Sequence, residues 1–125
     1  MNAAAIIIAL MLGADSDRSL LNALRAVESG SRANPPDGDG GRSIGPYQIM
    51  RGYWQDSGVP GDYRQCRERA YSERVIRAYW RRYCPRGTDE QKARCHNSGS
   101  NWRRKYKATN AYWSKVKRQL ERSRR

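Results

Sequence analysis

Apolar residues recur at helical spacing near the beginning of the chain. Leu20, Leu24 and Val27 lie three or four positions apart, which is the spacing of one face of an α-helix. The acidic and hydroxyl residues at 15–17 are candidate N-caps for this helix, and Gly30 is placed to end it. The pattern therefore predicts an amphipathic helix that finishes just before Gly30.

The segment after this helix has the composition of a loop. Residues 31–45 contain two prolines and four glycines, and a small β-hairpin is expected around residues 39–41. Residues 47–54 are mixed in polarity and predict one or two turns of helix, and a glycine-proline break follows at residues 58–61.

Three further helices are predicted in the second half of the chain. The longest covers about residues 63–84, where apolar and aromatic residues repeat at helical spacing. Thr88 can cap a short helix, residues 96–99 are expected to form a turn, and a last helix begins at Thr109 or Asn110. Together these elements indicate an α+β fold that is predominantly helical, with a small β or loop element after the first helix.

The two ends of the chain differ in character from the middle. Residues 3–12 are all apolar and are followed by Gly13-Ala14, which is typical of a signal peptide, although no Lys or Arg precedes the run. The run is too short to span a bilayer as a helix. We expect residues 1–14 to be a signal peptide or apolar leader of a secreted or periplasmic protein, residues 15–120 to form one domain, and residues 121–125 to be a frayed basic tail. The alternative for residues 1–14 is a buried first helix that continues into residue 18.

Charge narrows the range of partners. The 125 residues include 25 Lys and Arg against 12 Asp and Glu, a net charge of +13. Such a balance implies attraction to polyanions, namely nucleic acid, anionic membranes or bacterial envelope polymers. The mean hydropathy of −1.01 is low, but four Trp and eight Tyr placed periodically favour a packed domain over disorder.

The chain contains three cysteines, Cys66, Cys84 and Cys95. An odd number leaves at least one thiol without an internal partner, and the absence of a Cys-x-x-Cys pair argues against a zinc ribbon. For a secreted protein we expect one disulfide, between Cys84 and either of the others.

Two carboxylates are candidates for catalysis. Glu28 falls in the last turn of the first predicted helix, where the helix dipole disfavours negative charge, so its pKa is expected to be raised. Asp37 and Asp39 lie on the polar glycine-rich loop, where a carboxylate stays ionised. One protonated and one ionised carboxyl group facing a cleft are the working groups of a glycosidase. The alternative is that all three are solvated helix-end and turn residues.

Short blocks of sequence follow one another in a specific order between about residues 20 and 118. They are Glu28-Ser29-Gly30, Gly45-Pro46-Tyr47-Gln48-Ile49, residues 52–58, 63–66 and 78–83, His96-Asn97-Ser98-Gly99, and residues 111–116. The ordered set resembles the invertebrate-type lysozymes, the family that includes destabilase. The first two blocks alone occur across lysozyme-like folds, including lytic transglycosylases.

The resemblance implies a lysozyme-like α+β fold and hydrolysis of the β-1,4 bond between N-acetylmuramic acid and N-acetylglucosamine in peptidoglycan. Glu28 matches the acid position of the family. The second carboxylate of the family lies seven residues before the glycine matched by Gly45, whereas Asp39 lies six and Asp37 eight residues before it. The interval from Glu28 to Gly45 is one residue shorter than in the family, which favours Asp39 and keeps Asp37 in reserve.

Other residues in the matched blocks are expected to bind substrate. These are Tyr47, Gln48, His96 and Asn97, with Tyr53 and Trp54 as further cleft candidates, although Trp54, Trp113 and at least half of the aromatics are expected in the core. The expected partners are peptidoglycan glycan strands, and anionic envelope polymers through charge. A monomer is expected, and neither a metal nor an organic cofactor is implied.

The chain departs from the family in its cysteines. Members are usually dense in disulfides, whereas Ile44 and Ser57 stand here at two positions that commonly hold cysteine. The chain therefore looks like a distant, cysteine-poor member, and the proposed chemistry does not depend on the missing residues.

Several alternatives stay open from the sequence. A lytic transglycosylase would need only the glutamate. A non-catalytic basic module would bind the cell wall or, through residues 103–107 and 115–125, nucleic acid, which ranks second because no recognised nucleic-acid motif is present. Some relatives are credited with isopeptidase activity, for which Ser43 and His96 lie in the matching regions.

Overall fold

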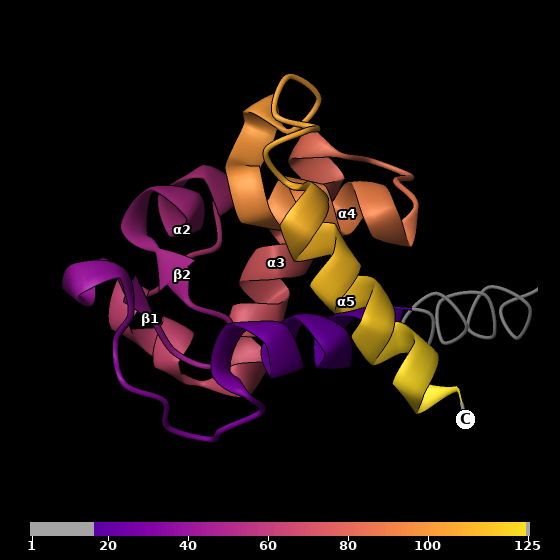
Figure 1. Ribbon diagram of the computed structural model, residues 1–125. Coiled ribbons are helices and arrows are strands. Elements are labelled where there is room, and N and C mark those ends of the chain that lie inside the picture. Colours follow the sequence, from indigo (N-terminus) through magenta and orange to yellow (C-terminus); the bar gives the residue numbers. More distant parts are fainter. Residues whose placement is uncertain (1–16, 125) are drawn as a thin grey trace, which may run out of the picture.

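The computed structural model describes residues 17–124. A first helix at residues 17–29 is followed by β1 (Ser43–Ile44), β2 (Ile49–Met50), α2 (Arg51–Ser57), α3 (Arg69–Tyr83), α4 (Asp89–Ser98) and α5 (Asn110–Ser123), with three short 3-10 helices between them. Figure 1 shows β1, β2 and α2 on one side of α3, with α4 and α5 on the other. The leader expected at residues 1–14 lies outside the described residues. Within residues 17–124 no helix has the length and apolar character needed to cross a membrane.

The core joins the first helix to α3 and α5. The side chains predicted to form the apolar face of the first helix are buried, apart from Val27, which packs against the core from its edge. Fully buried aliphatic side chains come from all three helices, namely Leu20, Leu21, Leu24, Val75, Ile76 and Val116, and Ile49 of β2 joins them. Burial of each contributes roughly 1.5–3 kcal/mol, and together they fix the helix that carries Glu28.

The β element is a two-stranded antiparallel hairpin. Ser43 pairs with Met50 and Ile44 with Ile49, and residues 45–48 form the turn. Gly45 has a φ of +77°, and a Cβ there would lie 1.9 Å from the carbonyl oxygen of Cys66, so only glycine fits. Residues 39–41, around which a small hairpin was predicted, form the 3-10 helix η1 (Asp39–Gly41), and an antiparallel bridge between Gly38 and Ser43 flanks them. The hairpin of β1 and β2 was not predicted.

The helix predicted over residues 47–54 also begins later than expected. The turn and strand of the hairpin take residues 45–50, so α2 starts at Arg51. It ends where Gly58 adopts the left-handed conformation, at the predicted break.

The long helix predicted over residues 63–84 is two elements. η2 (Tyr63–Arg67) begins at Asp62, whose side chain forms a capping box with Gln65, and the extended residue Glu68 separates it from α3. The aromatic and apolar periodicity runs across this break because both elements face the same core.

The turn predicted at residues 96–99 was also wrong. The capping box of Thr88 and Gln91 starts α4 at Asp89, and the helix continues to Ser98 because Gly99 is the first residue with a positive φ. Thr109 is the N-cap of α5, which confirms the predicted start. The tail expected to fray from residue 121 is instead helical as far as Ser123.

A buried carboxylate ties the first helix, the hairpin turn and α3 together. Glu73 of α3 accepts hydrogen bonds from Arg18 at 2.7 and 2.5 Å, from the hydroxyl of Tyr47 at 2.6 Å and from Arg69 at 3.2 Å. Burial opposes its ionisation, but these donors outweigh burial and lower the pKa of Glu73 to about 2. Glu73 is therefore a charged structural residue.

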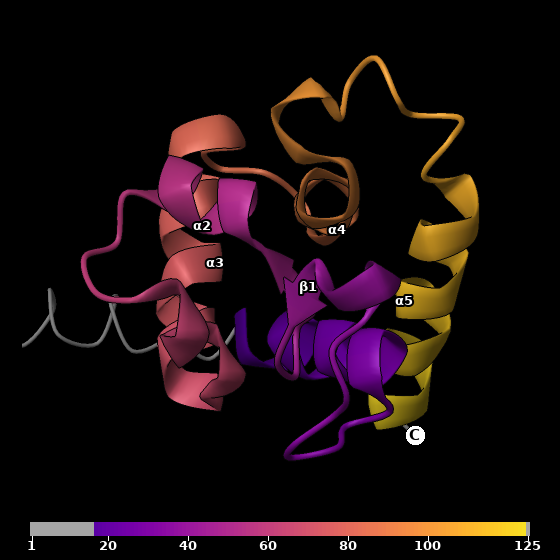
Figure 2. The same ribbon diagram turned by 90° about the vertical axis from the view of Figure 1, so that its left-hand side faces the viewer.

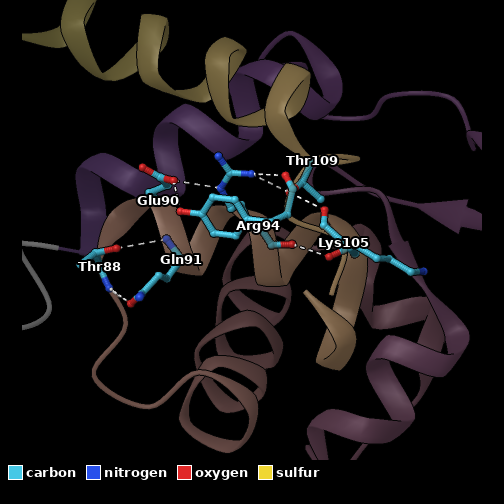
Figure 3. Close-up of polar contacts among 8 residues, drawn as sticks. Thr88, Glu90, Gln91, Arg94, Lys105 and Thr109 are labelled. Carbon is cyan, nitrogen blue, oxygen red and sulfur yellow. Dashed lines mark hydrogen bonds and ion pairs between the residues drawn. The ribbon is translucent and has the colours of Figure 1, made fainter. Parts of the chain in front are cut away.

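A buried arginine fixes the connection between α4 and α5. Arg94 is only 3% exposed and donates to Glu90 at 3.1 Å and to Thr109 Oγ1 at 3.0 Å (Figure 3). It also donates to the backbone carbonyl of Tyr106, whose ring centroid lies 3.7 Å from the guanidinium carbon. These contacts hold the start of α5 in place, and α5 forms one wall of the cleft described below.

The cysteines and aromatics serve packing. Cys66, Cys84 and Cys95 are all buried free thiols, so the disulfide expected for Cys84 is absent from the structure.

Six of the twelve aromatic side chains are buried and five more pack against the core, Trp54 and Trp113 among them, which confirms the expected core role of the aromatics. The exception is Tyr106, which is 44% exposed.

Candidate active site

A cleft of about 640 Å³ lies between the hairpin side of the molecule and the α4–α5 side. In Figure 2 the hairpin stands between the first helix, α4 and α5, which together surround this region. The residues that line the cleft include Val27, Glu28, Asp39, Ser43, Gln48, Ile49, Tyr53, Asp56, His96, Asn97, Tyr112 and Lys115. Tyr79 of α3 lines it as well, so segments from six parts of the sequence meet here.

Glu28 enters the cleft from the end of the first helix and is half-buried. Burial raises its pKa from 4.5 to about 7, so the carboxyl group holds a proton up to near-neutral pH. The Tyr112 hydroxyl partly offsets this rise. That hydroxyl is buried without a hydrogen-bond partner of ordinary geometry among the described residues, and it faces Glu28.

The two aspartates of the loop have different surroundings. Asp39 lines the cleft, its side chain is 53% exposed, and Arg42 Nη2 lies 3.3 Å from its Oδ1. Asp37 is absent from the cleft lining and pairs with Arg67 at 3.1 Å. Of the two, only Asp39 shares the cleft with Glu28.

Gln48 and its neighbour Tyr47 face opposite ways. Gln48 lines the cleft, where its amide accepts from Ser43 Oγ at 3.0 Å and donates to the carbonyl oxygen of Gly45 at 2.9 Å. The sequence predicted that Tyr47 lines the cleft. In the structure its side chain is instead fully buried and hydrogen-bonded to Glu73. Tyr47 points into the core because its turn packs against α3.

His96 and Asn97 both line the cleft from the end of α4. His96 Nδ1 lies 3.0 Å from the Tyr53 hydroxyl, and the Tyr53 ring stacks on Tyr79 with a centroid separation of 3.8 Å. Burial lowers the pKa of His96 to about 4, so the imidazole is neutral at pH 7 and supports the Tyr53 side of the cleft. Asn97 is exposed, and its side chain forms no hydrogen bond with another residue in the range 17–124.

Ser43 and His96 do not form a nucleophile–base pair in this structure. The Ser43 hydroxyl donates to Gln48, and the His96 side chain contacts the Tyr53 hydroxyl and the backbone of Tyr47. An isopeptidase dyad would need Ser43 and His96 within hydrogen-bond reach of each other.

Several cleft residues were not singled out from the sequence, Asp56, Tyr112 and Lys115 among them. Tyr112 and Lys115 come from α5, and Asp56 comes from α2. Tyr112 lies four positions before Val116 and eight before Leu120, and this helical spacing was the available sign that it faces inward. Nothing in the local sequence marks Asp56. Among residues 17–124, no three His, Cys, Asp or Glu side chains are grouped so as to hold a metal ion.

Comparison with known proteins places these observations in a family. A family model described as Destabilase matches residues 17–119. The chain is 37% identical over 84 residues to a protein named Lysozyme from Magallana gigas, covering 62% of this chain and 60% of that protein. It is 40% identical over 83 residues to Lysozyme 1 from Crassostrea virginica, covering 62% of this chain and 45% of that protein. It thus spans less than two thirds of the length of either relative.

The fold has a solved counterpart. A chain in the crystal structure of Aeromonas hydrophila PliI in complex with Meretrix lusoria lysozyme matches with a TM-score of 0.70 and 28% identity, covering 80% of this chain and 87% of that chain. The predicted lysozyme-like α+β fold is confirmed. Because the family model covers most of the sequence, the chain belongs to the destabilase family, the invertebrate-type lysozymes.

Proposed function

We propose that this chain is a glycoside hydrolase that cleaves the β-1,4 bond between N-acetylmuramic acid and N-acetylglucosamine in bacterial peptidoglycan. The observation that carries the proposal is the pairing of two unlike carboxyl groups in one cleft: half-buried Glu28, with a pKa of about 7, and exposed Asp39. The family and the two relatives named as lysozymes support the same reaction.

In the proposed mechanism Glu28 is the general acid. Its proton passes to the glycosidic oxygen as the bond to the leaving sugar breaks. The resulting carboxylate then takes a proton from the water that attacks the anomeric carbon, which restores the starting state. The raised pKa suits both steps, because an acid works best when its pKa lies near the working pH.

Asp39 is the proposed second carboxylate. It would stabilise the positive charge that develops at the anomeric carbon or form a bond to that carbon. Asp39 is exposed on a polar loop, and Arg42 Nη2 lies 3.3 Å from its Oδ1. Gln48, His96 and Asn97 are the proposed substrate contacts, with Asn97 free to bind an acetamido group.

The first test is clearing of a peptidoglycan suspension by the parent chain and by Glu28→Gln, with both shown to be folded by circular dichroism. We expect the variant to lose at least about 100-fold in rate. A folded parent that clears no wall preparation would exclude the hydrolase and leave a binding module as the better description.

The second test separates a hydrolase from a lytic transglycosylase. Asp39→Asn and Asp37→Asn make the same change on the same loop, but only Asp39 lines the cleft. A hydrolase loses activity in Asp39→Asn, keeps it in Asp37→Asn, and releases reducing ends. Full activity in Asp39→Asn with anhydro-muramic products would instead establish a transglycosylase.

A further inference from the structure

A polar groove leaves the cleft between the first helix and α5. Its first hollow, of about 220 Å³, is lined by Val27, Lys115, Arg118, Gln119 and Arg122. Val27 and Lys115 also line the cleft, so the two spaces adjoin. A second hollow, of about 350 Å³, shares Gln119 and Arg122 with the first and is bounded by small residues of the first helix such as Ser19 and Ala23. Both ribbon views show the first helix and α5 lying against each other (Figures 1 and 2).

One wall of this groove carries a row of positive charges. Arg118 lies three positions and Arg122 seven positions after Lys115 along α5. This spacing places the three side chains on one face of the helix. All three are exposed, and none forms an ion pair with another residue in the range 17–124. No acidic side chain of the described chain lines either hollow. The groove is therefore suited to a ligand with several negative charges.

The dimensions and position of the row match a specific part of peptidoglycan. Lys115 and Arg122 are seven residues apart on α5, a rise of about 10 Å along the helix. The peptide stem branches from the muramic acid residue, carries free carboxylates, and spans about 13 Å when four residues are extended. Val27, the neighbour of Glu28 in the chain, lines both the cleft and the groove, so a sugar bound beside Glu28 would lie next to the start of the groove.

We infer that this groove binds the peptide stem of peptidoglycan, with Lys115, Arg118 and Arg122 recognising the stem carboxylates. The inference rests on the proposed function, because it assumes a muramic acid residue in the cleft. It adds that the enzyme distinguishes stem-bearing glycan from the same glycan without stems, which the two catalytic carboxylates alone cannot do.

The test compares two pairs of charge removals on α5 and its C-cap residue, Arg124. Arg118→Gln/Arg122→Gln removes charge from the groove, and Lys117→Gln/Arg124→Gln removes the same charge from exposed residues that line neither hollow. Each pair is made in the Glu28→Gln chain so that ligands survive. Binding is measured by calorimetry with soluble muropeptide oligomers, and with the same oligomers after an amidase has removed the stems.

We expect the groove pair to weaken binding of stem-bearing oligomers by about three- to tenfold, as two exposed ion pairs would. Its binding of stem-free oligomers, and all binding by the control pair, should change less than about twofold. The preference should shrink as salt is raised. Equal losses of affinity in the groove pair and the control pair, or equal losses for stem-bearing and stem-free oligomers, would contradict the inference. Either result would mean that the charges attract the ligand only in a general way. Failure of Glu28→Gln to bind even stem-free glycan would count against the proposed function, separately from the groove.

Discussion

The hydroxyl of Tyr47 donates a 2.6 Å hydrogen bond to Oε2 of Glu73, joining the hairpin turn to α3. The next residue, Gln48, faces the cleft, so this buried bond sets the position of a cleft wall without reaching the cleft itself. A residue that looks like a sugar-binding aromatic in the sequence is therefore a structural one.

Replacing Tyr47 with Phe should reduce stability and leave catalysis nearly unchanged. The variant removes a hydrogen bond to a buried, charged carboxylate, which costs about 1.5–3 kcal/mol. Urea unfolding at pH 7 measures the loss, and kcat/KM on soluble glycan should stay within about twofold of the parent below the unfolding transition. A stable variant with a raised KM would restore Tyr47 to the substrate site.

The activity of the enzyme should fall on the alkaline side as Glu28 loses its proton. The pKa of Glu28 in the folded chain is about 7, and only the protonated form can act as the acid. We expect kcat/KM to decrease about tenfold per pH unit above pH 7, since the fraction of protonated Glu28 falls by that factor. A pH profile that stays flat up to pH 9 would remove Glu28 from the role of general acid.

The sequence predicted the order and type of most elements, because apolar residues at helical spacing in the first helix and α5 become buried faces. It failed where capping decided the outcome: Asp62 and Thr88 each start an element through a capping box, which shifts helix boundaries that periodicity alone leaves continuous. It placed Glu28 and Asp39 correctly in one cleft, whereas the inward turn of Tyr47 depends on Glu73, 26 residues away in the chain. Such long-range pairing leaves no local pattern.

Two glycines of the same loop region should respond very differently to alanine. Gly45 and Gly40 both have positive φ, +77° and +64°, so alanine is strained at either position by about 1–2 kcal/mol. At Gly45 the new Cβ would also lie 1.9 Å from the backbone oxygen of Cys66, whereas at Gly40 nothing lies within 4 Å. We expect Gly45→Ala to lose well over about 3 kcal/mol of stability or not to fold, and Gly40→Ala to lose only the strain term. Similar melting temperatures for the two variants would contradict the close approach of the hairpin to η2.

Glu28 and His96 should make opposite contributions to the dependence of stability on pH. The folded-state pKa of Glu28 is raised to about 7 from 4.5, so the folded chain holds this proton more tightly, and its contribution to stability grows as pH falls from 7 to 4.5. The folded-state pKa of His96 is lowered to about 4 from 6.5, so its contribution is full above pH 6.5 and is lost as pH falls toward 4. Between pH 6.5 and 4.5 the two slopes largely cancel.

Single substitutions should separate the contributions of Glu28 and His96 to the dependence of the free energy of unfolding on pH. In Glu28→Gln only the histidine term remains, so the free energy of unfolding should drop by about 1–3 kcal/mol between pH 6.5 and 4.5. In His96→Gln only the glutamate term remains, and stability should rise over the same interval by a similar or smaller amount, because Glu28 is partly exposed to solvent. At pH 8 Glu28→Gln should be more stable than the parent, since it removes a half-buried charge. Urea titrations at constant ionic strength measure all three chains. Parallel stability curves for the parent and both variants would mean that burial does not set these two protonation states, and would remove the physical basis for Glu28 as an acid near neutral pH.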